Sequence, residues 1–184
     1  MAEGKPVTRP IIFSAPMVRA LLDGRKTMTR RLAWREPRDP TTHRIADSYQ
    51  RPSLWQKTQV GDLLWVRETF APKASGSYYF PSDTDGTVYH SWKSSIHMPR
   101  WASRLTLAVT AIKVEHLQAI DGIEALAEGI DREEGVAPWR IFMRLWNSIH
   151  GEGAWQLNPE VVAITFTVQR CNVDALSPPP ASRG

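Results

Sequence analysis

The chain of 184 residues contains a single cysteine, Cys171. One thiol cannot form a disulfide within the chain, and it excludes a metal site built from several cysteines. The five histidines show no metal-ligand spacing, so no metal or other cofactor is expected. No apolar run approaches the length of a membrane span, and residues 1–9 contain no hydrophobic signal segment. The sequence therefore predicts a cytoplasmic protein that acts without a metal and without a membrane.

A large excess of charge is also missing. The 23 Lys and Arg residues outnumber the 19 Asp and Glu residues by a formal charge of only +4. Such an excess favours anionic partners, nucleic acid among them, but it is small for a protein that binds a long phosphate backbone. A pocket for one base or nucleoside needs only a few cations. No segment indicates an obligate protein partner.

The basic charge is densest between Gly24 and Arg31, where four cations and two threonines stand in eight residues. Ser14 is a candidate N-cap for a helix with its apolar residues at helical spacing, and Gly24 is placed to end that helix. Residues 27–31 are predicted to form a strand. This basic stretch is either a solvated surface strand or the floor of a site for an anionic group.

The remaining pattern predicts an α+β protein. Short strands are separated by loops rather than by regular helices, which favours a small mixed barrel over a doubly wound sheet. Residues 1–9 are predicted to be a flexible arm and residues 171–184 a flexible tail. A single domain covers residues 10–170, with insertions at about 34–59 and 71–98. The predicted strands are 10–13, 27–31, 63–70, 105–114 and 160–170, and the later helices are 121–128 and 138–149.

Within these elements, two packing details are predicted. Residues 78–80 and 87–92 pair as a hairpin across Asp85-Gly86. An apolar stripe on the last helix packs into the core. The stripe residues are Trp139, Phe142, Leu145, Trp146 and Ile149.

Two further groups are candidates for a binding site. Alternation places Glu68 in line with Leu64 and Val66, which makes it a candidate buried acid, or else a partner for a nearby arginine. The segment around His97, Arg100 and Trp101 offers a ring to stack on a base and a guanidinium for a phosphate. The alternative for Trp101 is a ring that packs over the end of the barrel.

Four local signals together resemble the ASCH domain, a branch of the PUA-like superfamily. The most specific is the helix that ends in Gly-Arg-Lys-Thr-x-Thr, at residues 24–29. The others are the Gly-Asp-x-Leu strand at 61–67, the helix that carries Glu128, and the closing strand at 161–168. In that helix Asp121 is the predicted N-cap, and Glu124, three residues on, completes a capping box. The resemblance spans residues 10–170, with both insertions outside the shared core. It implies a PUA-like mixed β-barrel of about five or six strands flanked by helices.

The resemblance also implies a function. Members of this superfamily bind RNA or modified bases, one has been linked to cleavage of single-stranded RNA, and one bacterial branch resembles an N4-acetylcytidine amidohydrolase. Carried over by motif, the catalytic residues of that branch are Lys26, Thr29 and Glu128, with Glu124 or Glu68 as alternative acids. The expected partner is a small nucleoside, with RNA as the second candidate. The candidate substrate-binding residues are Arg25, Arg30, Glu68, His97, Arg100 and Trp101.

Amide hydrolysis needs a nucleophile and a group that removes its proton. The Thr29 hydroxyl is the candidate nucleophile, and Lys26 is the candidate base if burial or neighbouring cations lower its pKa. Glu128 orients Lys26 or gives a proton to the leaving amine. Residues three apart on a strand face opposite sides, so Lys26 is expected in the turn before the strand.

Overall fold

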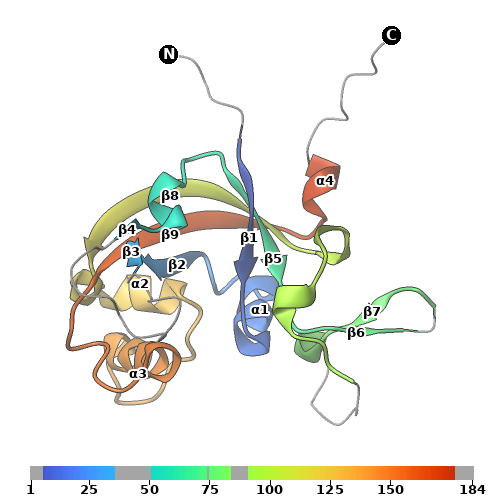
Figure 1. Ribbon diagram of the computed structural model, residues 1–184. Coiled ribbons are helices and arrows are strands. Elements are labelled where there is room, and N and C mark those ends of the chain that lie inside the picture. The colour runs from blue at the N-terminus through green and yellow to red at the C-terminus, as the bar shows by residue number, and fades with distance from the viewer. Residues whose placement is uncertain (1–5, 36–50, 74, 84–90, 177–184) are drawn as a thin grey trace, which may run out of the picture. The chain divides into compact units, whose positions relative to one another are not determined.

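The computed structural model describes residues 6–35, 51–73, 75–83 and 91–176 (Figure 1). The chain folds as two compact units. The first unit contains Met1–Arg25, Gly61–Val109 and Phe166–Gly184, and the second contains Lys26–Val60 and Thr110–Thr165. The predicted insertion at 34–59 lies in the second unit, and that at 71–98 lies in the first. The single ASCH/PUA-like domain over residues 10–170 stays a prediction.

A mixed five-stranded sheet has the strand order β1-β5-β8-β9-β2. β1 runs parallel to β5, whereas β5–β8 and β2–β9 are antiparallel pairs. With the helices, this sheet confirms the predicted α+β class, and closure into a barrel stays a prediction. The five strands are β1 (Thr8–Ile12), β2 (Met28–Leu32), β5 (Leu63–Arg67), β8 (Thr106–His116) and β9 (Glu160–Gln169).

The sheet and a short helix reach into the segments predicted to be flexible. β1 begins at Thr8, inside the predicted arm, because Asp62 accepts a hydrogen bond from the Val7 backbone N–H at 2.8 Å and extends the pairing. α4 (Val173–Leu176) lies inside the predicted tail, where the Val173 side chain is fully buried.

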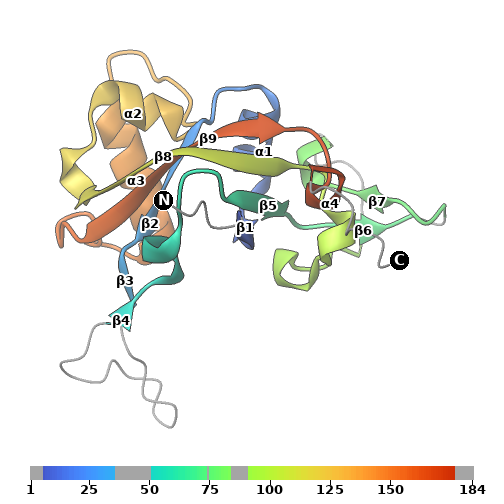
Figure 2. The ribbon, with the colours of Figure 1, turned by 90° about the horizontal axis from the view of Figure 1, so that it is seen from above.

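Two small two-stranded sheets complete the strands: β3 (Trp34–Arg35) with β4 (Arg51–Pro52), and β6 (Ala71–Pro72) with β7 (Tyr78–Tyr79). Figure 2 shows β6 and β7 side by side. β7 pairs with β6, because Gly76, with φ of +83°, turns the chain back onto Ala71 and Pro72, whereas the sequence predicts that residues 78–80 pair with 87–92. Residues 84–90 of that prediction lie outside the described residues.

The first helix, α1 (Ala15–Leu22), ends where the sequence predicts. Gly24 has φ of +73°, its N–H donates to the Leu21 carbonyl, and the Arg25 N–H donates to the Ala20 carbonyl. These two bonds and the left-handed glycine form a Schellman motif. The motif turns the chain sharply, so that the next residue, Lys26, begins a new direction.

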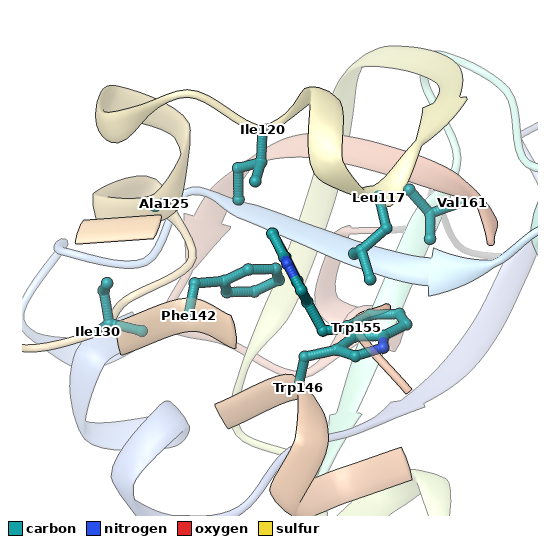
Figure 3. Close-up of a cluster of buried hydrophobic side chains, with 8 residues drawn as sticks. All are labelled: Leu117, Ile120, Ala125, Ile130, Phe142, Trp146, Trp155 and Val161. Carbon is teal, nitrogen blue, oxygen red and sulfur yellow. The ribbon is translucent and has the colours of Figure 1, made fainter. Parts of the chain in front are cut away.

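Two helices, α2 (Gly122–Ala127) and α3 (Pro138–His150), pack together in the second unit. The Asp121 side chain caps α2 by accepting from the Glu124 N–H at 2.7 Å, as predicted. Behind both helices lies a buried apolar cluster, with the rings of Phe142, Trp146 and Trp155 at its centre (Figure 3). The other members are Leu117, Ile120, Ala125, Ile130 and Val161.

The apolar stripe on α3 is only partly in this core. Phe142 and Trp146 are buried, whereas Trp139 is 38% exposed and Ile149 is 63% exposed. The prediction that Ile149 packs into the core is therefore wrong. Ile149 belongs to the last turn of α3, where Gly151 redirects the chain with φ of +104°.

Candidate functional site

The residues that follow α1 lie alongside the end of α2. Lys26 and Glu128 form an isolated antiparallel bridge, and the Thr27 N–H donates to the Ala127 carbonyl at 2.9 Å. This pairing brings Lys26 next to Glu128, which lies 102 positions further along the chain. Lys26 sits before β2 rather than on it, as the turn geometry predicts.

The Lys26 side chain is buried, with an exposed fraction of only 2%. Its Nζ lies 2.9 Å from the Met28 carbonyl, 2.6 Å from the Glu128 carbonyl and 3.0 Å from Glu128 Oε2. Three acceptors match the three N–H groups of an ammonium, whereas a neutral amine has two. The Lys26 side chain is thus held in one position, and a solvated surface strand is excluded for this residue.

Glu128 occupies the C-cap of α2, followed by Gly129 with φ of +85°. A carboxylate at a helix C-terminus opposes the helix dipole and would ordinarily be solvated. Here the side chain is buried and bonded on both oxygens. Oε2 accepts from Lys26 at 3.0 Å, and Oε1 accepts from Arg30 Nη1 at 3.3 Å. The two cations offset the unfavourable dipole.

Arg30 binds two further carboxylates. Its Nη2 donates to Glu115 Oε1 on β8 at 2.8 Å and to Glu124 Oε2 on α2. The guanidinium side chain has no exposed surface. With Glu128 counted, three carboxylates surround this guanidinium. Their negative charges compensate the positive charge that Arg30 brings to β2.

Lys113 completes the group from the surface. Its half-exposed ammonium pairs with Glu115 Oε2 at 3.0 Å and with Glu124 Oε1. The hydrogen bond to Glu124 raises the pKa of Lys113, with Glu115 adding to the effect. Carboxylates therefore compensate the basic side chains that this site takes from the stretch Gly24–Arg31.

The environment of Lys26 changes how readily it loses a proton. Burial lowers the pKa of Lys26 below its ordinary value, because the charged ammonium is removed from water. The Glu128 carboxylate raises this pKa but does not cancel the effect of burial, and the cations of Arg31 and Arg30 lower it further. Because its pKa is lowered, a larger fraction of Lys26 is neutral at neutral pH than for a solvated lysine, and only the neutral amine can accept a proton.

Thr29 is buried on β2, opposite Ile164 of β9. Because Thr29 and Arg30 are neighbours on a strand, their side chains leave opposite faces of the sheet. Thr29 takes no part in the hydrogen bonds described above. The structure thus brings Lys26 and Glu128 into direct contact, with Arg30 as a third member that the sequence placed only among the substrate-binding residues.

The predicted site residues divide between the two units. Lys26, Thr29, Arg30 and Glu128 belong to the second unit, and the other five belong to the first. Those five are Arg25, Glu68, His97, Arg100 and Trp101.

In the first unit, Glu68 is buried, as its alternation with Leu64 and Val66 predicts. Its Oε1 accepts from Arg104 Nε at 2.9 Å, and its Oε2 accepts from Arg104 Nη2 at 3.1 Å and from Ser82 Oγ at 2.9 Å. Its arginine partner, Arg104, lies 36 residues further along the chain, at the entrance to β8, and is not a close neighbour in the sequence. Glu68 therefore connects the end of β5 to the segment before β8.

The remaining candidates lie at the surface of the first unit. Arg25 pairs with Asp23 at 3.2 Å, and Arg100 pairs with Asp174 at 2.7 Å, both with exposed side chains. His97 is exposed at the end of a short 3-10 turn. Trp101 is 66% exposed, and its ring centroid lies 5.5 Å from that of Tyr78. Trp101 thus covers the edge of a small apolar cluster while presenting one face outward.

Lys113 and Glu115 were missed from the sequence. They lie two residues apart on β8, so they share a face of the strand. The alternating Lys-Val-Glu pattern at 113–115 is a signal that could have marked them as one charged face.

No protein-family model matches this sequence, and no curated protein matches it. Two solved structures are similar to the chain. One is the protein EF3133 from Enterococcus faecalis V583, described by the family model DUF984, with 11% identity over 94% of this chain and 86% of that one, at a TM-score of 0.42. The other is an ASCH domain from Lactobacillus crispatus JV V101, with 15% identity over 88% of this chain and 79% of that one, at a TM-score of 0.40.

The second of these structures carries the family name that the sequence motif resembles. At TM-scores this low, neither likeness supports an inference about what this chain does. Among the described residues, no helix has the length and apolar character needed to cross a membrane. In the same part of the chain, no group of three or more His, Cys, Asp or Glu residues is arranged to hold a metal ion.

Proposed function

We propose that this protein is a metal-independent amidohydrolase that removes the acyl group from N4-acylcytidine or related N4-acylcytosine nucleosides. The observation that supports the proposal most is the buried contact between Lys26 and Glu128, at 3.0 Å. These are two of the three residues to which the motif resemblance assigns catalysis. A buried lysine with a lowered pKa, fixed by a carboxylate, is a typical general base.

The proposed reaction begins at the Thr29 hydroxyl. Lys26 in its neutral form takes the hydroxyl proton through one intervening water, because Thr29 leaves β2 on the face opposite Arg30, while Thr29 Oγ1 attacks the acyl carbonyl carbon. The Lys26 ammonium formed in this step returns the proton to the exocyclic nitrogen as the bond from carbon to nitrogen breaks. Cytidine leaves, and a water molecule then hydrolyses the threonine ester to release the carboxylic acid. Throughout, Glu128 holds Lys26 in position.

The compensated charge of the site favours a small neutral substrate. Lys26 and Arg30 already bind the carboxylates of Glu115, Glu124 and Glu128. Their charges are therefore not available to a phosphate backbone, whereas an acylated nucleoside carries no charge at neutral pH. This supports a free nucleoside as the substrate class.

The test is to incubate the protein with N4-acetylcytidine in the presence of a chelator and to measure cytidine by chromatography. Lys26→Met, Thr29→Ala and Glu128→Gln are each expected to lower kcat/KM by at least about 10²-fold, the contribution of a positioned proton-transfer group. Arg144→Ala, which removes an exposed ion pair with Glu133, is expected to leave the rate unchanged. Circular dichroism spectra of all variants check that they fold.

Each result has a defined consequence. Full activity of the Thr29 variant would overturn its role as the nucleophile. This test is needed because the Thr29 side chain leaves β2 on the face opposite to that of Arg30. No release of cytidine by the unmodified protein would overturn the amidohydrolase.

A second candidate function is a module that binds RNA or a modified base, with cleavage of single-stranded RNA as its enzymatic form. The observation that favours it is the exposed ring of Trp101, which lies beside Tyr78 and follows Arg100 in the sequence. Base stacking on an aromatic ring contributes about 1–3 kcal/mol. Trp101→Ala is then expected to weaken binding of a labelled single-stranded RNA by roughly tenfold or more, measured by anisotropy. Trp139→Ala, at an exposed ring of the second unit, is the matched control.

A further inference from the structure

Four charged side chains form a closed ring of ion pairs in the second unit. Arg30 Nη2 pairs with Glu115 and Glu124, and the same two carboxylates pair with Lys113 through their other oxygens. In this charged ring, the positive charges of the two cations equal the negative charges of the two carboxylates. The ring joins three elements, since Arg30 belongs to β2, Lys113 and Glu115 to β8, and Glu124 to α2.

Arg30 has a further N–H group that points away from the charged ring, to Glu128. Nη1 donates to Glu128 Oε1 at 3.3 Å, while Lys26 donates to the other carboxylate oxygen, Oε2, at 3.0 Å. Each oxygen of the Glu128 carboxylate is therefore bound by a different cation. This arrangement fixes the plane of the carboxylate and, with it, the acceptor that faces Lys26.

We propose that Arg30 is a positioning residue: held by the charged ring, it keeps the Glu128 carboxylate fixed against Lys26 Nζ and so controls how readily Lys26 gives up its proton. The meaning of this control for catalysis rests on the amidohydrolase proposed above. Arg30 itself touches Glu128 and not Lys26, so its effect on the reaction passes through Glu128.

An arginine suits this position for a geometric reason. Its planar guanidinium presents five N–H donors in a rigid fork, which allows one side chain to bind carboxylates on β8 and α2 and still reach Glu128. A lysine has a single charged nitrogen and cannot maintain three carboxylates in these separate directions. The buried position of Arg30, with no exposed side-chain surface, keeps the interaction from being screened by salt.

The charges around Lys26 determine whether a change at Arg30 raises or lowers the pKa of Lys26. The groups that act on it are Glu128 at the end of α2 and Arg30 and Arg31 on β2. Behind Arg30 lie Glu115 and Lys113 of β8 and Glu124 of α2. Removing the Arg30 cation is expected to raise the pKa of Lys26, because a neighbouring positive charge is lost and the Glu128 carboxylate then pairs with Lys26 alone. Neutralising Glu115 is expected to lower it, because a negative charge is lost and Arg30 is drawn more strongly to Glu128.

The decisive experiment follows the Lys26 side chain without using catalysis. Protein labelled with ¹³C at lysine Cε is titrated by NMR, and the Lys26 signal is assigned from the Lys26→Met variant. In Arg30→Met, the titration midpoint of Lys26 is expected at a higher pH than in the unmodified protein. In Glu115→Gln, which retains the shape of the side chain, it is expected at a lower pH. Arg144→Met, from an exposed ion pair, is expected to leave the midpoint unchanged.

Shifts of opposite sign in Arg30→Met and Glu115→Gln would support the proposal, since a merely stabilising role would not move the midpoint in both directions. If Arg30→Met fails to fold, the Glu115→Gln titration alone decides. An unchanged Lys26 midpoint in a folded variant overturns it.

The pH profile of kcat/KM with N4-acetylcytidine then connects Arg30 to the reaction. The acidic limb is expected to move to higher pH in Arg30→Met, with a loss at pH 7 on the order of 10²-fold, the cost of a small misplacement of a catalytic group. In Glu115→Gln the limb is expected to move to lower pH. If the unmodified protein releases no cytidine, the proposed function fails, whereas the NMR titration still decides the role of Arg30.

Discussion

Replacing Glu128 by alanine is expected to lower the free energy of unfolding by about 3–5 kcal/mol, the cost of leaving a buried charge without its partner. Lys26 has 2% of its surface exposed, and Glu128 supplies two of the three acceptors described around its Nζ, one of them the carboxylate. The backbone carbonyl of residue 128 remains in the variant, but the compensating negative charge is lost. Urea unfolding, followed by circular dichroism at neutral pH, measures the change.

Two further variants serve as comparisons for the stability loss of Glu128→Ala. Glu133→Ala removes an ion pair of similar length, 3.0 Å, from the surface of the same unit, where the side chains of Arg144 and Glu133 are 54% and 45% exposed. An exposed pair contributes about 0–1 kcal/mol, so this control is expected to change little. Glu128→Gln is expected to cost less than alanine, because the amide oxygen still accepts a hydrogen bond. A Glu128→Ala loss no larger than that of Glu133→Ala would contradict the burial argument.

The local parts of the site were predictable from the sequence. Gly24 ends α1 because a left-handed residue is required after the last turn, and glycine adopts that conformation without strain. Asp121 caps α2 because its short side chain places a carboxylate oxygen within reach of the Glu124 N–H, three residues along the chain. Gly24 fixes the point at which the chain leaves α1 shortly before Lys26, and Asp121 fixes the start of α2, whose C-cap is Glu128. Such signals depend only on neighbours in the chain, which is why they were found.

The contacts across the site were not predictable in the same way. The Lys26–Glu128 bond spans 102 positions, and only the resemblance to a known motif suggested that these residues act together. Glu124 illustrates the difficulty, since a capping box predicts that its side chain turns back toward Asp121. Its carboxylate instead binds Arg30 and Lys113. Leaving a buried guanidinium unpaired costs more free energy than leaving an exposed helix start without a second cap.

A change at Phe142 is expected to have an effect of similar size on stability. Phe142→Ala removes a ring that is 3% exposed, with the Trp146 and Trp155 ring centroids at 6.1 and 6.3 Å (Figure 3). Truncating a buried phenylalanine costs about 3–5 kcal/mol through lost burial and the cavity left behind. Urea unfolding measures this loss, and the fluorescence of the neighbouring tryptophans is expected to change in the folded variant.

Ile149→Ala is the matched control on the same helix, and it tests the point at which the sequence prediction failed. Both residues belong to one apolar stripe by spacing, but Ile149 is 63% exposed, in the last turn of α3. An exposed substitution of this kind is expected to change stability by no more than about 0.5 kcal/mol. A loss comparable to that of Phe142→Ala would mean that the whole stripe is covered in solution, because helical spacing identifies a face of a helix but only packing decides how far along the helix that face is buried.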